Sequence, residues 1–265
     1  MIRSPESPKI VLAIGGSDCS AGAGIQADLK AIHDNGGYAL TVVTGVVAET
    51  PHNVVSYETV SPKLIEQQIL CLLDLFPVSA IKVGLLFTPE IVKVVSDAIN
   101  NRGIPVVVDP VGAASSGTVF GGEAYRKALV ELLFPLGRLI TPNLPETCLF
   151  LGIEQATGID LSELFSMRFQ VPALIKGGHS ETDEASDIYA VSGNVSDVFT
   201  SKRLEVPDLH GTGCTLASAI ATYLACGSPI QEAISAGKFY MEKVMKGHFT
   251  WEGNIHALGN ASDCA

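Results

Sequence analysis

Residues 10–30 read IVLAIGGSDCSAGAGIQADLK, an apolar run followed by a glycine-rich loop and the start of an amphipathic segment. Residues 10–14 are apolar at successive positions, which is typical of a strand covered on both faces. The glycines of residues 15–24 allow the backbone to approach a ligand closely. Residues 24–35 have the apolar spacing of a helix. A strand, a loop and a helix in this order predict the first unit of an α/β fold.

The same alternation continues along the chain. Further apolar runs cover residues 40–47, 80–86, 106–108, 139–140 and 173–175, and helical segments are predicted at residues 62–75, 89–101 and 123–133. This order implies βαβ units and a mainly parallel sheet. Residues 186–190 and 195–200 flank a Ser-Gly-Asn turn and predict an antiparallel hairpin. Two more helices are predicted at residues 213–225 and 229–245.

Composition excludes several classes of protein. Hydrophobic residues make up 47% of the 265 residues and charged residues 17%, a balance that excludes intrinsic disorder. Neither a linker-like stretch nor an internal repeat divides the chain. We therefore expect a single domain over residues 1–265, with a flexible N-terminus at residues 1–8 and a C-terminal tail at residues 247–265.

Charge and cysteine content limit the possible partners and location. Lys and Arg number 17 against 28 Asp and Glu, and the net charge of −11 argues against nucleic-acid binding. No uncharged apolar run reaches the ~20 residues of a membrane span, and the N-terminus lacks the apolar core of a signal peptide. The six cysteines are scattered, so we expect reduced thiols in a cytoplasmic protein.

The motif His210-Gly211-Thr212-Gly213-Cys214-Thr215 opens a helix of small residues. Backbone N–H groups at a positive helix end form a ready anion site. Cys214 lies at this helix start, where a thiolate is favoured. The structural alternative is that glycine and alanine serve only close helix packing.

Charged side chains follow several predicted strands. Asp109 comes after residues 106–108, and Glu146 after residues 139–140. One or two carboxylates, completed by waters and phosphates, usually hold magnesium. Lys176 follows residues 173–175 and could neutralise phosphate. Alternatively, Asp109 is a turn or helix cap and the lysine is solvated.

Several standard sites are absent from the sequence. It contains no G-x-x-x-x-G-K-[ST], H-E-x-x-H or G-x-S-x-G, so a P-loop, a zincin and an α/β-hydrolase elbow are unsupported. Residues 22–27 match G-x-G-x-x-A but begin eight residues after Ile14, which makes them a weak dinucleotide signal.

Five segments, taken in this order, resemble the hydroxymethylpyrimidine and phosphomethylpyrimidine kinases of thiamine biosynthesis, in the ribokinase superfamily. They are residues 14–18 with 22–30, 109–111, 140–146, 176–179 and 210–215. The resemblance implies a three-layer α/β/α, ribokinase-like fold and a homodimer. It also implies ATP with Mg²⁺, and transfer of phosphate to a hydroxymethyl group and then to the resulting phosphate.

The resemblance also implies roles for individual residues. Gly16, Asp28, Glu49, Leu85 and Val111 would form the pyrimidine pocket. Asp109 and Glu146 would organise the metal. ATP would contact Lys176, Asn143, Thr212 and Gly213, while Gly211, Gly213, Lys176 and Cys214 would form the catalytic centre, with Cys214 as the base.

The chain also departs from the family pattern. Glu49 stands where these kinases usually have a glutamine, Leu85 replaces a common methionine, and Ser115 stands where relatives often have lysine. A carboxylate accepts hydrogen bonds only, unless it is protonated, so Glu49 would favour a ring with an amino group or a protonated nitrogen. Alternatively, Glu49 is an exposed turn residue. Residues 152–172 predict no clear helix.

Three alternatives to a pyrimidine kinase remain at this stage. The first is a pyridoxal-type kinase on the same scaffold. The second is a dinucleotide-binding protein without kinase activity. The third is a binding protein that keeps the fold without turnover, against which Asp109, Lys176 and Cys214 argue.

Overall fold

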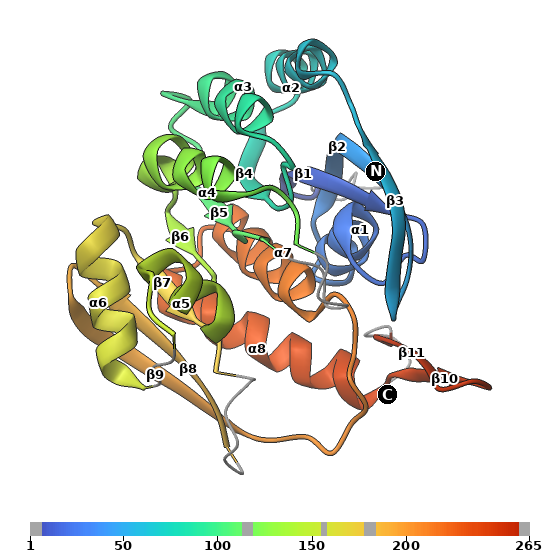
Figure 1. Cartoon of the computed structure of the whole chain (residues 1–265), viewed down its shortest axis with the longest axis vertical. Helices are drawn as coiled ribbons and strands as arrows, with labels where there is room; N and C mark the ends of the chain where they lie inside the picture. The colour runs from blue at the N-terminus through green and yellow to red at the C-terminus, as the bar shows by residue number, and fades with distance from the viewer. Residues whose placement is uncertain (1–6, 113–118, 155–157, 178–183, 260–265) are drawn as a thin grey trace, which may run out of the picture.

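The computed structural model describes residues 7–112, 119–154, 158–177 and 184–259. At its centre is a nine-stranded sheet with the order β3-β2-β1-β4-β5-β6-β7-β8-β9 (Figure 1). The strands from β2 to β7 in that order pair in parallel, and β3, β8 and β9 join antiparallel. The bounds are β1 (Ile10–Asp18), β2 (Tyr38–Thr50), β3 (Asn53–Thr59), β4 (Val78–Val83), β5 (Val106–Val108), β6 (Leu139–Ile140), β7 (Ala173–Ile175), β8 (Glu184–Val191) and β9 (Asn194–Lys202).

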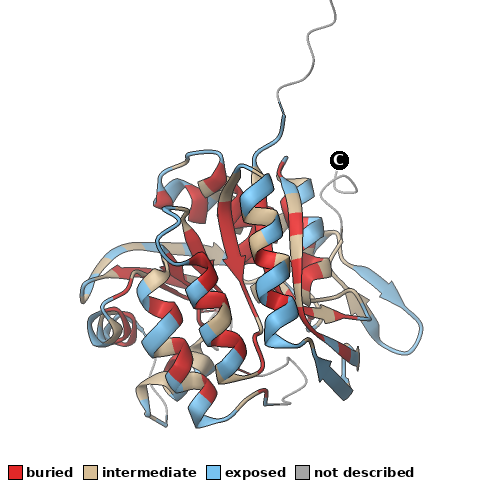
Figure 2. Cartoon of the chain, turned by 90° about the horizontal axis from the view of Figure 1, so that it is seen from above, coloured by how far each residue is buried: buried red, intermediate tan, exposed pale blue. Residues whose placement is uncertain are grey.

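Helices cover both faces of this sheet, so the predicted three-layer α/β/α fold is confirmed (Figure 1). Each helix has a buried face and an exposed face (Figure 2). Helices α2, α3, α4 and α6 pack on one face, and α1, α7 and α8 on the other. The bounds are α1 (Gly24–Asp34), α2 (Pro62–Leu75), α3 (Pro89–Ile99), α4 (Glu123–Ala128), α5 (Leu144–Leu151), α6 (Ile159–Phe169), α7 (Thr212–Ala225) and α8 (Ile230–Lys246).

Strand β1 shows why the central runs are apolar at successive positions. Leu12 and Ile14 join the core under α2 and α3, whereas Val11 and Ala13 join the core under α1 and α7. All four side chains are fully buried. A strand with two buried faces needs apolar residues at every position, which is the pattern seen in the sequence.

Local signals fix the starts of several helices. Pro62 and Pro89 follow the capping residues Ser61 and Thr88, whose side chains accept hydrogen bonds from backbone N–H groups of the first turn. Helix α7 begins after Gly211, which has a φ of +84°. A Cβ there would overlap the carbonyl oxygen of Gly22. The glycine loop and the start of α7 are therefore in close contact.

The structure corrects several element predictions. Strand β1 pairs with β2 through Asp18, with a register shift after Gly15, so the glycine loop begins at Cys19. The segment at residues 152–172, which predicted no clear helix, contains α6. Residues 123–133 are an α-helix only to Ala128 and continue as a π-helix, η1 (Leu129–Leu133), and a 3₁₀ turn, η2 (Phe134–Leu136).

Sequence analysis also missed some strands. These are the edge strand β3 and the small hairpin of β10 (Phe249–Trp251) and β11 (Ile255–Ala257), which lies in the expected tail. Predictions that concern residues 1–6, Ser115, His179 and residues 260–265 lie outside the described residues. Within the described part of the chain, no helix combines the length and apolarity needed to cross a membrane.

Candidate active site

A cavity of about 680 Å³ opens beyond the carboxyl ends of the parallel strands. This is where open α/β sheets bind ligands, because the loops that follow the strands converge there. The glycine loop, the end of β2 and the starts of α5 and α7 contribute to its walls. The predicted site residues that line it are Gly16, Glu49, Leu85, Asp109, Val111, Asn143, Glu146, Lys176, Gly211, Thr212, Gly213 and Cys214.

Asp28 was predicted to line the pyrimidine pocket, and the structure corrects this. Its side chain is fully buried beneath the cavity, where it accepts hydrogen bonds from Lys82 Nζ at 2.7 and 3.0 Å and from Ser218 Oγ at 2.8 Å. Lys82 lines the cavity instead. Burial lowers the pKa of Lys82, but Asp28, with smaller contributions from Cys214 and Asp109, more than offsets this, and the net shift is upward. Burial also raises the pKa of Asp28, which Lys82 opposes. The floor of the site is therefore a buried, tightly paired lysine and aspartate.

Lys82 is a site residue that sequence analysis missed. It lies within the apolar run at residues 80–86, and its side chain is 1% exposed. Lysine is almost never fully buried unless it is paired. A lone lysine in such a run was the signal that could have identified it.

Asp109 and Lys176 meet from the ends of β5 and β7. Lys176 Nζ donates to Asp109 Oδ1 at 2.9 Å, and Asp109 is 3% exposed. Burial raises the pKa of Asp109, but the positive charges of Lys176 and Lys82 together lower it by more. The net shift of the Asp109 pKa is therefore downward. A Cβ on Gly213 would lie 3.0 Å from Lys176 Nζ and 3.3 Å from Asp109 Oδ2. Glycine at residue 213 thus lets the pair sit against the start of α7.

Glu146 and Asn143 form a capping box at the start of α5. The Asn143 N–H donates to Glu146 Oε2 at 2.9 Å, and the Glu146 N–H donates to Asn143 Oδ1 at 2.8 Å. Glu146 therefore caps this helix, and its side chain also faces the cavity. Burial raises the pKa of Glu146 to about 7; Lys176 opposes the rise, and Asp109 adds to it.

The donor set of Asp109 and Glu146 fits a magnesium ion. Two carboxylates that line one cavity repel each other, and a divalent cation between them and a phosphate would relieve that repulsion. Magnesium is usually held by one or two carboxylates, with water and phosphate completing its ligands.

Cys214 lies in the first turn of α7, as expected. The expectation that its side chain is a thiolate is wrong. The surrounding protein desolvates the thiol and raises its pKa to about 12; Asp109 and Asp28 add to the rise, and Lys82 opposes it. The dipole of one helix end does not compensate for burial near two carboxylates. Cys214 is therefore a neutral thiol in this structure.

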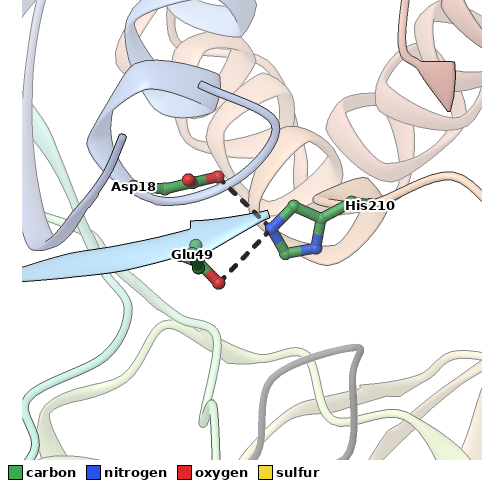
Figure 3. A group of neighbouring side chains, drawn as sticks. All are labelled: Asp18, Glu49 and His210. Carbon is green, nitrogen blue, oxygen red and sulfur yellow. Dashed lines mark ion pairs between the residues drawn. The ribbon is translucent and has the colours of Figure 1, made fainter. Parts of the chain in front are cut away.

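A second cluster joins Asp18 at the end of β1, Glu49 on β2 and His210 before α7 (Figure 3). His210 Nε2 lies 3.3 Å from Asp18 Oδ2 and 3.9 Å from Glu49 Oε2. Side-chain exposures are 2% for Asp18 and 7% for both Glu49 and His210, so the exposed-turn alternative for Glu49 is wrong. Sequence analysis did not identify Asp18 or His210 as site residues, although both lie inside the quoted motifs.

The glycine loop holds the Asp18 carboxylate. The Asp18 carboxylate accepts hydrogen bonds from Ser20 N, Ser20 Oγ, Gly22 N and Ala23 N at 2.7–3.0 Å. Burial raises the pKa of Asp18, but His210 and the loop donors lower it, and the net shift is well below the usual range. The cluster also presents three metal-ligating atoms within 4.8 Å of one another. Asp18, Glu49 and His210 are thus a second group of described residues that could hold a cation.

Another part of the cavity lies between β8, β9 and α8. Lys238 Nζ on α8 donates to Asp187 Oδ2 at 2.7 Å, and Gly177 N donates to Asp187 Oδ1 at 2.9 Å. Met241 and Met245 add apolar surface to this wall. The combination of apolar surface and a few fixed polar groups is typical of a small-molecule site.

The profile of one protein family, phosphomethylpyrimidine kinase, matches residues 18–258. Hydroxymethylpyrimidine/phosphomethylpyrimidine kinase from Rhizobium meliloti is 38% identical over 238 residues, which cover 88% of each chain. Thiamine biosynthesis bifunctional protein ThiED from Geobacter sulfurreducens is 37% identical over 254 residues. That match covers 92% of this chain, which spans only 50% of the bifunctional protein.

Two solved structures show the same fold. A Bacillus subtilis pyridoxal kinase, determined as an ADP complex, has a TM-score of 0.86 at 30% identity, covering 96% of this chain and 98% of that one. Phosphomethylpyrimidine kinase from Clostridium difficile 630 has a TM-score of 0.75 at 32% identity, covering 88% of this chain and 98% of that one. The ribokinase-like architecture is thereby confirmed, and the two neighbours are kinases named for different rings.

Proposed function

Because this chain belongs to the phosphomethylpyrimidine kinase family, we propose that it transfers phosphate from ATP to 4-amino-5-hydroxymethyl-2-methylpyrimidine in thiamine biosynthesis. The phosphomethyl product would be a second acceptor, as the names of its relatives suggest. The observation that carries the proposal is the meeting of Lys176 and Asp109 with the glycine start of α7 in one cavity. Such a site combines a cation, a carboxylate and backbone N–H donors for phosphate.

Phosphoryl transfer needs positioning and charge stabilisation more than covalent chemistry, because its transition state is loose. We propose that N–H groups at residues 211–213 bind the phosphate oxygens and that Lys176 balances their charge. Asp109 and Glu146 would hold Mg²⁺, which when bound neutralises phosphate charge. Asn143 and Thr212, which also line the cavity, would complete the nucleotide contacts.

Cys214 is the proposed base for the acceptor hydroxyl. Because its thiol is neutral in this structure, it must lose its proton before it can accept another. A nearby cation favours the thiolate, and Lys82 already acts on Cys214 in this direction. We therefore propose that Cys214 first orients the hydroxyl. When the cationic groups at the bound phosphate are in place, the thiol releases its proton to water in the cavity, and the thiolate then accepts the proton of the acceptor hydroxyl.

The ring would lie near Gly16, Glu49, Leu85 and Val111, which share the cavity with the phosphate groups. A pyridoxal-type kinase is the second candidate, because the pyridoxal kinase structure superposes more closely than the pyrimidine kinase structure. The test is product identification by mass spectrometry, with ATP, Mg²⁺ and a panel of pyrimidine and pyridine alcohols. Preferential phosphorylation of the aminopyrimidine supports the proposal, whereas preferential phosphorylation of pyridoxal would assign the second function.

We further propose a single kinase domain over residues 1–265 that works in the cytoplasm as a homodimer. The cysteines among the described residues are free thiols, which suits a reducing compartment. Edge strand β3 exposes Val55 and Tyr57, apolar surface that a second copy could cover. Light scattering after size exclusion tests the assembly, and a monomer at micromolar concentration would contradict it.

A further inference from the structure

We propose that Asp187 is a positioning residue for Lys176, the cation of the proposed phosphate site. Asp187 would act through the backbone of Gly177, and Lys238 would hold Asp187 in place. This inference rests on the proposed function, since it specifies what fixes the cation that the function requires.

The first step of the argument is the place of Lys176 in the sheet. Strand β7 ends at Ile175, which pairs with Ile188 of the antiparallel strand β8. In the same register, Gly177 would stand opposite Ser186. The Gly177 N–H nevertheless donates to the side chain of Asp187, at 2.9 Å from Oδ1. A carboxylate, and not a backbone carbonyl, therefore receives the N–H that directly follows Lys176.

The second step is the close packing of this segment. A Cβ on Gly177 would overlap the carbonyl oxygen of Ser186, so the position needs glycine. On the other side, the Lys176 N–H donates to the carbonyl oxygen of Pro142 at 3.0 Å. The backbone of Lys176 is thus held between the segment that follows β6 and the carboxylate of Asp187.

The third step is that Asp187 is itself held. Lys238 Nζ on α8 donates to Asp187 Oδ2 at 2.7 Å, and the two side chains are 15% and 10% exposed, respectively. Burying a carboxylate costs more free energy than burying a neutral acceptor. A charged acceptor, however, forms hydrogen bonds about twice as strong as neutral ones. Asp187 therefore restrains the Gly177 N–H more tightly than a neutral side chain would.

This restraint reaches the phosphate site through the Lys176 side chain. Its Nζ donates to Asp109 Oδ1 at 2.9 Å, beside the start of α7. Because the aliphatic stem of lysine is flexible, its ammonium stays in place only if both ends of the side chain are held. Asp109 holds Nζ, whereas Pro142 and Asp187 hold the backbone. A displacement of about 1 Å near the reacting groups can cost about 10²-fold in rate.

The alternative is that Asp187 only ends the pairing of β7 with β8. Its loss would then lower the stability of the fold, and any effect on nucleotide binding would be the same with or without Lys176. A double-mutant cycle separates the two roles, because the effects of residues that act through each other are not additive.

The experiment measures the dissociation constant of AMP-PCP, a non-hydrolysable ATP analogue, by calorimetry in the presence of Mg²⁺. The variants are Asp187→Leu, which removes the acceptor, and Asp187→Asn, which keeps a neutral oxygen for the Gly177 N–H. Each is made alone and in combination with Lys176→Ala. Asp97→Asn is the matched control, because Asp97 pairs with Lys93 at the same 2.7 Å but on the exposed surface of α3.

We expect Asp187→Leu to raise the dissociation constant at least about tenfold, because the Lys176 backbone loses an anchor. Asp187→Asn should raise it about fivefold or less, because the anchor persists in a weaker form. In the Lys176→Ala background, each substitution should change the dissociation constant less than about twofold. Asp97→Asn should bind AMP-PCP as the wild type does.

Three results would overturn the inference: wild-type affinity in a folded Asp187→Leu, equal losses in Asp187→Leu and Asp187→Asn, or effects of equal size with and without Lys176. If thermal unfolding shows that Asp187→Leu does not fold, the cycle of Asp187→Asn with Lys176→Ala decides by itself. These measurements need no acceptor. The proposed function, by contrast, fails if mass spectrometry finds no phosphorylated ring alcohol.

Discussion

Lys176 Nζ lies 2.9 Å from Asp109 Oδ1, although 67 residues separate the two in the sequence. The pair joins the ends of β5 and β7 and lies against Gly213 at the start of α7. It therefore brings together the motifs that contain Asp109, Lys176 and Gly213. Asp109 keeps Lys176 charged despite burial, which fixes a cation where phosphate would arrive.

Removing this cation should slow the chemical step. We expect Lys176→Ala to lower kcat by about 10²- to 10³-fold, because transition-state charge loses a positioned partner. Thermal unfolding must be followed in parallel, since the variant leaves Asp109 buried without its lysine. Lys93→Ala, which alters an exposed lysine on α3, is the control. Wild-type kcat in a folded Lys176→Ala would contradict the assignment.

The carboxylates should control the magnesium dependence. We expect Asp109→Asn and Glu146→Gln to raise the Mg²⁺ concentration for half-maximal activity about tenfold or more, because each loses a charged ligand. Glutamine at residue 146 can still complete the capping box, so α5 should remain folded. Magnesium titrations at saturating ATP measure the effect. An unchanged titration midpoint in both variants would show that other groups hold the metal.

The thiol of Cys214 should react slowly. With its pKa raised to about 12 by burial, it is protonated at pH 8, and the reactive thiolate grows only as the pH rises toward that value. We expect iodoacetamide at pH 8 to label exposed Cys226 well before Cys214, as followed by peptide mass spectrometry. Faster labelling of Cys214 would show that the site stabilises a thiolate.

Substitution of Cys214 tests its role in turnover. We expect Cys214→Ala to lower kcat by about 10²-fold or more while leaving ATP affinity nearly unchanged, because a positioned proton acceptor is lost. Cys214→Asp should retain part of the activity, since aspartate also accepts a proton. If Cys214→Ala keeps the wild-type kcat with both substrates saturating, Cys214 is not the base, and the motif at residues 210–215 serves only to bind phosphate.

Glu49 should make the free enzyme less stable as the pH rises. Its folded-state pKa of about 7 exceeds the ordinary 4.5, so the folded state binds more protons than the unfolded state between these values. The free energy of unfolding therefore falls as pH rises through this window and levels off above it. We expect Glu49→Gln to gain about 1–3 kcal/mol relative to the wild type between pH 4.5 and pH 8.

Urea unfolding at both pH values measures this difference, with Glu58→Gln as the control. Because Glu58 is exposed on β3, its substitution should leave the pH dependence unchanged. A difference between the wild type and Glu49→Gln that does not depend on pH would show that Glu49 is ionised throughout the window.

The order and type of the main elements could be predicted because they depend on local chemistry. Residues 10–14, apolar at successive positions, identify a buried central strand, and Pro62 and Pro89 mark helix starts where their φ is tolerated. The two glycines of residues 210–215 likewise predicted the start of α7. Strand β3 was missed because it lies at the edge and its residues are largely exposed, so no apolar pattern distinguished it.

The pairings within the site could not be predicted, because each joins residues from distant parts of the chain. The family resemblance implied that Asp28 lines the pocket, whereas in the structure Asp28 is bound to Lys82 and Ser218 beneath the floor of the cavity. The helix start suggested a thiolate at Cys214, but desolvation by the assembled cavity outweighs the dipole. Glu49 is a carboxylate by residue type, and its pKa rises to about 7 because folding buries it and brings the anion Asp18 beside it. Residue type specifies which groups can ionise; burial and neighbouring charges, which exist only in the folded chain, determine whether they do.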